Sequence, residues 1–139
     1  MMKTEPMRPQ PSNHLRIARP SADLEQAERF WVDGLGLEVL HRAGPEAEGG
    51  NALLMLGWPQ AAWHLELVAD TRGHTLANPT DEDLLVLYLG DPVDQETVNA
   101  LIRAGGRQVA ARNPYWDRWG FTIADPDGYR LVLSHRSWP

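Results

Sequence analysis

The chain of 139 residues contains no cysteine, a single lysine and no long apolar run. Without cysteine it forms neither a disulfide framework nor a thiolate metal site, and it has no thiol nucleophile. No segment approaches the roughly 20 apolar residues of a membrane-spanning helix, and the first residues lack the apolar core of a secretory signal. These absences predict a soluble, cytoplasmic protein without a membrane partner.

Positive charge is also scarce, with 13 basic against 19 acidic residues and a formal net charge of -6. Proteins that bind nucleic acid usually present a basic face to the phosphates, and no run of lysine or arginine occurs here. We therefore expect no nucleic-acid partner. The length fits one domain that is large enough to enclose a small-molecule cavity.

The sequence repeats itself. Residues 14–18 resemble residues 84–88 at an offset of 70, and residues 63–68 resemble residues 129–134 at an offset of 66. Such self-similarity indicates two copies of one supersecondary unit, neither of which buries its apolar face alone.

Each unit is expected to contain a strand, a helix and three strands. In the first unit, Asp23 and Gln26 have the spacing of a capping box at a helix start, and Gly34 is expected to end that helix in the left-handed conformation. The strands are predicted from alternation and turn residues at 14–19, 37–41, 51–56 and 63–68, then at 84–89, 107–111, 121–124 and 129–135, with the second helix at 93–104. The prediction is an α+β fold with a flexible N-terminal tail at 1–12 and a single domain at 13–139, made of βαβββ modules at 13–70 and 83–136.

The repeat, the element order and the Asp-Pro-Asp-Gly turn at 125–128 together resemble the vicinal oxygen chelate superfamily, which contains glyoxalases, bleomycin-resistance proteins and extradiol dioxygenases. The resemblance covers about residues 13–136. It implies that the modules form a cup-shaped mixed sheet around a small organic ligand. It also implies a homodimer, in which modules pair within one chain or are exchanged between two.

In that superfamily the metal ligands project from the first and last strands of each module. Those positions fall on His14 and Glu66 in the first module, and on Leu84 and Val132 in the second, where neither side chain binds a cation. A catalytic metal site needs about three protein ligands and an open position, so the resemblance supplies only two of them.

Strand alternation adds a third candidate, because His64 lies on the same face as Glu66, about 7 Å along the strand. His14, His64 and Glu66 would then form a two-histidine, one-carboxylate set suited to Fe, Ni, Zn or Mn. The alternative is a pocket without a metal or other cofactor, in which Arg16 pairs with Glu66 and stabilises its charge.

The segment 113–119 is the densest aromatic stretch and is expected to form a shaped loop. Tyr115 and Trp116 would wall the pocket and stack on a planar ligand, while Asn113 and Arg118 supply polar contacts. The same residues also suit a cover over the open edge of the cup, or a dimer interface.

The leading hypothesis is a protein that binds a small organic molecule in the cavity of its sheet without a complete metal site. The expected lining consists of residues from both modules: His14, Arg16, His64, Glu66, Tyr115 and Trp116. One alternative is a divalent-metal-dependent lyase, isomerase or dioxygenase, in which Glu66 or a bound water moves a proton. Another is metal-free acid–base catalysis by Glu66, which requires burial to raise the pKa of its carboxyl group.

Overall fold

The computed structural model describes residues 5–46, 51–70, 73 and 75–139. The first module contains β1 (Leu15–Pro20), α1 (Leu24–Glu28), the π-helical η1 (Arg29–Gly34), β2 (Glu38–Ala43), β3 (Ala52–Gly57) and β4 (Trp63–Ala69). The second contains β5 (Leu84–Tyr88), α2 (Gln95–Arg103), β6 (Arg107–Val109), α3 (Pro114–Trp119), β7 (Gly120–Ala124) and β8 (Arg130–Ser134). The repeat of two βαβββ modules is confirmed.

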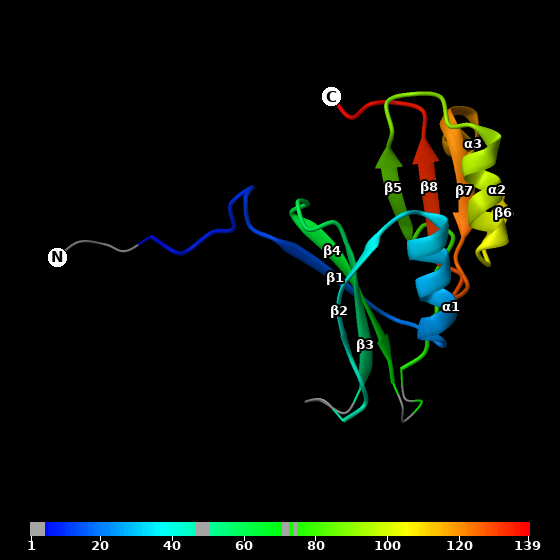
Figure 1. The fold of residues 1–139 in the computed structure, drawn as a ribbon. Coiled ribbons are helices and arrows are strands. Elements are labelled where there is room, and N and C mark those ends of the chain that lie inside the picture. The colour runs from blue at the N-terminus through cyan, green and yellow to red at the C-terminus, as the bar shows by residue number, and fades with distance from the viewer. Residues whose placement is uncertain (1–4, 47–50, 71–72, 74) are drawn as a thin grey trace.

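The strands form two four-stranded mixed sheets, one in each module (Figure 1). Their orders are β1-β4-β3-β2 and β5-β8-β7-β6, and in each sheet the first strand of the module lies parallel to the last. Among the described residues β1 and β5 each pair on one side only, so both are edge strands. One chain therefore supplies two separate four-stranded sheets rather than one continuous sheet.

The first helix begins as its capping residues predict, since the Asp23 carboxylate accepts from the backbone N–H groups of Glu25 and Gln26. Its end was predicted wrongly. The helix widens into the π-turns of η1, so the chain reaches its left-handed residue at Gly36 (φ 94°) rather than at Gly34. Gly34 instead permits close helix packing, because a Cβ atom there would lie 3.0 Å from the Cβ of Ala104.

The hydrophobic core lies between the two sheets, and the buried faces of α1, η1 and α2 contribute to it. Its largest members are Phe30 and Trp31, which pack with leucines of β3 and β4 on one side and with Ile123, Leu131 and Leu133 of the second sheet on the other. Because side chains alternate along a strand, the opposite faces of the two sheets point outward, away from this shared core. They are called here the outer faces.

The two outer faces differ in what covers them. Segment 113–119 forms the short helix α3 rather than the predicted loop, with Asn113 as its N-cap and Pro114 in its first turn. This helix contacts β7 and β8, and Thr122, Val132 and Ser134 on the second outer face are at most 1% exposed. Several residues of the first outer face are exposed or half-buried, among them Arg16, Ala18, His41, Met55 and Glu66.

The strand pairing also corrects the alignment of the two modules. Leu15 pairs with Trp63, 48 residues on, whereas Leu84 pairs with Arg130, 46 residues on. The offset between the first strands of the two modules must therefore exceed the offset between their last strands by two residues. The repeat predicted offsets of 70 and 66, which differ by four. A shift of two residues keeps a side chain on its face, so the predicted faces stand although the residue counterparts do not.

The described part of the predicted tail, residues 5–12, extends away from the sheets (Figure 1). Residues 1–4 of that tail, and residues 71–72 and 74 between the two predicted modules, lie outside the described residues. Within the described part of the chain, no helix has the length and apolarity to cross a membrane.

Candidate functional site

The first outer face brings together the polar residues that the sequence selected. Arg16 on β1 pairs in register with His64 on β4, and Ala18 pairs with Glu66. His14 directly precedes β1. Because β1 and β4 are parallel neighbours, their side chains of matching register stand side by side. All four candidates of the first module therefore lie in one cluster, which is called here the His-Arg cluster: His14, Arg16, His64 and Glu66.

The cluster is joined by short polar contacts. His14 Nε2 and His64 Nδ1 are 2.6 Å apart, and Arg16 Nε donates to His64 Nε2 at 3.1 Å. Arg16 Nη1 lies 3.7 Å from Glu66 Oε1, which is the predicted pairing of these two charges. His64 therefore uses both ring nitrogens inside the cluster.

The side chains of the His-Arg cluster differ in how far they are exposed to solvent. His64 is buried, the Glu66 side chain is 14% exposed, and the Arg16 side chain is 52% exposed. Burial lowers the pKa of His64, and the neighbouring His14 and Arg16 lower it further, whereas Glu66 opposes them. The buried imidazole is therefore held in its neutral form, while the charge nearest to solvent is the guanidinium of Arg16.

This geometry does not fit the predicted metal triad. The two histidines are hydrogen-bonded to one another, and the Arg16 guanidinium occupies the space between His64 and Glu66 where a cation would sit. A divalent ion would meet a positive charge and a ring nitrogen that is already bonded. Within the described ranges, no group of three or more His, Asp or Glu side chains is arranged to hold a metal ion.

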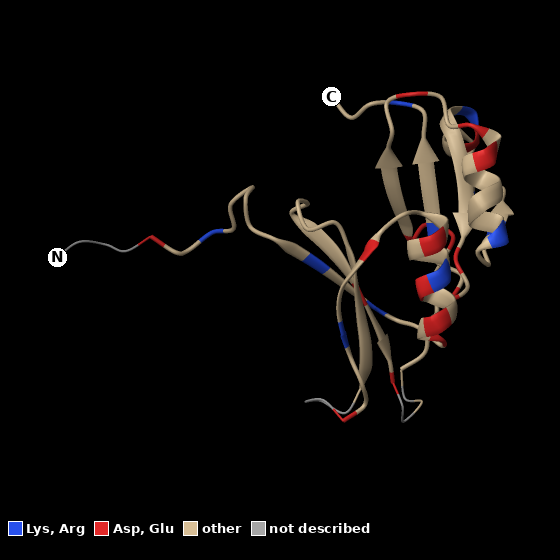
Figure 2. Ribbon diagram, viewed as in Figure 1, with Lys and Arg blue, Asp and Glu red and all other residues tan. Residues whose placement is uncertain are grey.

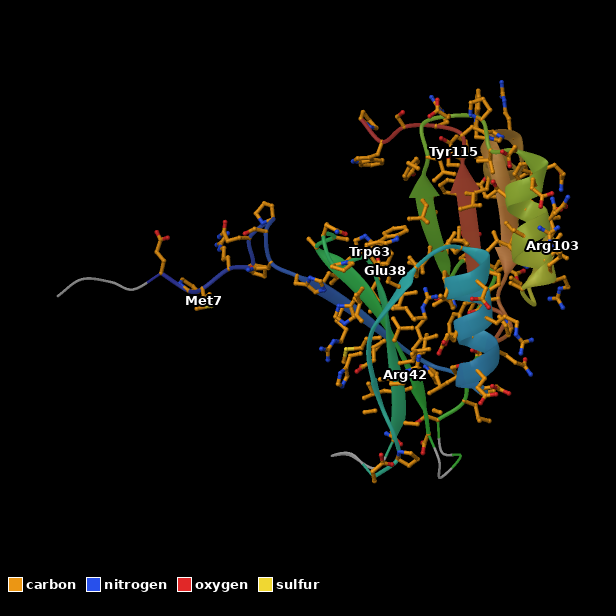
Figure 3. All side chains as sticks on the ribbon, viewed as in Figure 1. Met7, Glu38, Arg42, Trp63, Arg103 and Tyr115 are labelled. Carbon is orange, nitrogen blue, oxygen red and sulfur yellow. The ribbon has the colours of Figure 1, made fainter. Side chains whose placement is uncertain are left out.

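The aromatic residues chosen from the sequence lie elsewhere. Tyr115 sits beside the second sheet, whereas Glu38, Arg42 and Trp63 lie on the first (Figure 3). Tyr115 borders a cavity of about 380 Å³, and its hydroxyl accepts from Arg136 Nη1 at 3.1 Å. One chain thus does not bring Tyr115 and Trp116 to the His-Arg cluster, and the lining role of both residues stays a prediction.

Sequence reasoning missed two partners in this aromatic cavity. Tyr88, at the end of β5, contacts Trp138 near the C-terminus, with ring centroids 5.5 Å apart and ring planes tilted by 50°, and both line the cavity. Alternation along β5 could have placed Tyr88 on the outer face. Nothing in the sequence pattern places Trp138, because it lies beyond the last strand. Asn113 and Arg118 were expected to contact the ligand. In the structure Asn113 caps α3, and the Arg118 guanidinium lies over the Trp119 ring.

A second cavity of about 290 Å³ opens between the edge strands β1 and β5. It is lined by apolar side chains from both modules: Leu15, Ile17, Trp31, Leu35, Trp63, Leu85, Val86, Leu87 and Leu131. Leu15 is 58% exposed at its mouth. A large exposed leucine beside two unpaired strand edges is typical of an interface between chains.

Asp125 was read from the sequence only as a turn residue. In the structure it is buried, accepts from the Trp31 indole at 3.2 Å, and accepts from the backbone N–H groups of Asp127 and Tyr129. Burial raises the pKa of its carboxyl group to about 6. The turn therefore ties the second module to the helix of the first.

Comparisons with known proteins agree with this architecture. Residues 15–68 match the YycE-like N-terminal domain family, and residues 82–135 match the YycE-like C-terminal domain family. The YycE protein of Bacillus subtilis (strain 168) is 37% identical over 123 residues, which are 87% of this chain and 86% of that protein. The chain belongs to the YycE-like family.

Solved structures of YycE-like and related proteins share the fold. The crystal structure of Bacillus subtilis YycE has a TM-score of 0.82 at 33% identity and covers 92% of this chain and 93% of its own. Glyoxalase I of Leishmania major has a TM-score of 0.66 at 21% identity, with 89% and 86% covered. The antibiotic-binding protein TnmS3 of Streptomyces sp. CB03234 has a TM-score of 0.60 at 22% identity, with 90% and 96% covered. This YycE-like chain therefore has the glyoxalase fold of the vicinal oxygen chelate superfamily.

Proposed function

We propose that this YycE-like protein binds a small organic molecule on the first outer face, in contact with the His-Arg cluster, without a metal or other cofactor. The observation that carries the proposal is the bond from Arg16 to His64, which places a guanidinium where the metal would sit. TnmS3, an antibiotic-binding protein with the same fold, supports a binding role. A cytoplasmic location remains part of the proposal.

A complete cavity is proposed to require a homodimer. The first outer face and the aromatic cavity belong to different sheets, whose outer faces point away from each other in one chain. Two chains that pair through the edges of β1 and β5 would cover the apolar cavity between these strands. The partner's second module would then face the His-Arg cluster. Analytical ultracentrifugation is expected to show a dimer, and a monomer would overturn this part of the proposal.

The binding role is tested by thermal unfolding with EDTA present, against bleomycin, fosfomycin and a series of aromatic carboxylates and ketones. A ligand at a hundred times its Kd is expected to stabilise the protein by about 2.7 kcal/mol. Arg16→Met is expected to abolish the shift. Arg103→Met is the matched control, because Arg103 is an exposed arginine on α2, outside the cluster, and its loss is expected to leave the shift intact.

Metal content distinguishes the rival function. After incubation with Fe(II), Ni, Zn and Mn and then desalting, elemental mass spectrometry is expected to find much less than one metal ion per chain. A ratio near one that disappears in Glu66→Ala would replace the proposal with a metal-dependent lyase, isomerase or dioxygenase that uses His14, His64 and Glu66.

A further inference from the structure

The hydrogen bonds of the His-Arg cluster fix where each imidazole proton lies. An arginine Nε–H only donates, so His64 Nε2 must offer its lone pair at the 3.1 Å contact. A neutral imidazole carries one proton, which is therefore on His64 Nδ1. That proton is donated across the 2.6 Å contact, so His14 Nε2 offers its own lone pair. The proton of a neutral His14 is then on Nδ1.

Both imidazoles therefore use their nitrogen lone pairs in hydrogen bonds within the cluster. Neither ring has an acceptor left for a ligand, while His14 Nδ1 retains an N–H donor. Arg16 uses only Nε in its bond to His64, and its Nη groups have the looser 3.7 Å ion pair with Glu66. A guanidinium has five N–H donors in a planar fork, so its remaining N–H groups suit the oxygens of a planar acceptor.

We propose that His14 and His64 are positioning residues, and that together they hold Arg16 so that the site receives a carbonyl or carboxylate oxygen of the ligand. This inference rests on the proposed binding function and names the chemistry that the site recognises. The buried His64, held on β4 between β1 and β3, aims the guanidinium. Arg16 and the Nδ1–H of His14 donate to the ligand oxygen.

Charge and exposure agree with an acceptor ligand rather than a cationic one. The Arg16 side chain is half exposed, while Glu66 is largely buried, so an approaching ligand meets the guanidinium first. Glu66 offsets the positive charge without a short hydrogen bond to the guanidinium. Neutral carbonyl and anionic carboxylate groups therefore both fit, because either offers lone pairs to N–H donors.

The first test needs no ligand. Long-range ¹⁵N NMR spectra of the imidazole rings in the full chain at neutral pH are expected to show the proton on Nδ1 in both His14 and His64. In Arg16→Met, His64 Nε2 loses its donor, so His64 is expected to become a mixture of tautomers. A proton on Nε2 of His64 in the unmodified protein would overturn the proposal, whether or not ligands bind.

The second test uses three matched probes of one size: benzoate, benzamide and benzamidinium. Benzoate and benzamide offer acceptor oxygens, so we expect them to shift the resonances of Arg16 Nε and His14 Nδ1. Benzamidinium has only donors and is expected to shift neither. A response to benzamidinium alone, or to none of the probes, would overturn the inferred ligand chemistry.

Two variants of His64 separate positioning from folding. His64→Leu is expected to weaken benzoate binding at least about fivefold, because the guanidinium loses its partner. His64→Gln is expected to restore binding to within about twofold, since the carboxamide oxygen can accept from Arg16 and the carboxamide NH2 can donate to His14, as the two nitrogens of the neutral ring do. Equal weakening in both variants would contradict a positioning role. If the proposed function fails instead, the tautomers are as predicted but no small molecule stabilises the protein.

Discussion

The two modules share one arrangement of strands, but their outer faces differ in polarity and in exposure to solvent. The first carries the His-Arg cluster in the open, with Arg16 half exposed. On the second, Thr122, Val132 and Ser134 are shut off from solvent, and α3 packs on their strands. Charge divides them less sharply: β1, β2 and β4 of the first sheet contain charged residues and β3 none, while in the second sheet β6 and β8 contain one arginine each and β5 and β7 none (Figure 2).

The modules also differ in one connection. In the second module the connection between β6 and β7 forms α3, whereas in the first module the described residues between β2 and β3, 44–46 and 51, form no helix. On the second outer face, whose strands α3 contacts, Thr122, Val132 and Ser134 are buried, whereas the polar groups of the first outer face are paired with one another. The two modules therefore keep the same frame although their connections and outer faces differ.

The largest expected effect comes from removing Trp31, which packs in the core between the two modules. Trp31→Ala is expected to lower the free energy of unfolding by about 3–5 kcal/mol, because it removes a buried indole between the two sheets. Trp31→Phe should cost about 1–2 kcal/mol through the lost bond to Asp125. Urea denaturation measures both. Trp138→Ala, at an indole that is 74% exposed, is the control, and a loss there as large as at Trp31 would contradict this assignment of the core.

The second prediction concerns how the free energy of unfolding depends on pH through Asp125, which bonds to Trp31 across the two modules. The pKa of Asp125 is raised from 3.8 to about 6 by burial, so the folded state favours the protonated carboxyl. Its contribution to stability is fully present below pH 3.8 and is lost as the pH rises through about 6, by up to about 3 kcal/mol. Urea denaturation from pH 4 to pH 7 is expected to show the unmodified protein losing stability relative to Asp125→Asn. A constant difference would mean that Asp125 is already ionised at pH 4.

The smallest effects sharpen the contrast between the outer faces themselves. Val132→Ala is expected to lower the free energy of unfolding by about 2 kcal/mol, because it removes two methyl groups from a fully buried site and leaves a small cavity. Glu66→Ala, on the matching strand β4, is expected to cost less than about 1 kcal/mol, since its partner Arg16 is half exposed. Thermal unfolding of the two variants side by side would show this. Equal losses would mean that the first face is as structural as the second.

Much of the fold was readable from local signals. The Asp23 cap, the apolar stripe of the first helix and the alternation that puts His64 beside Glu66 on one face each depend on residues a few positions apart. The helix end was misplaced at Gly34 because π-turns have no clear sequence signature. Segment 113–119 was expected to be a loop, although Asn113 followed by Pro114 is a helix-start signal.

The sequence by itself determined the repeat, the order of the strands with one helix after the first strand of each module, and the common face of Arg16, His64 and Glu66, because these follow from spacing along one strand or helix. Only the tertiary structure decided that the Arg16 guanidinium reaches His64 and that His14 meets the same ring. Those contacts join residues 48 and 50 positions apart, and their lengths depend on how β1 and β4 align. The aromatic residues also stayed away from the His-Arg cluster for a tertiary reason, since the shared core turns the outer faces of the two sheets to opposite sides.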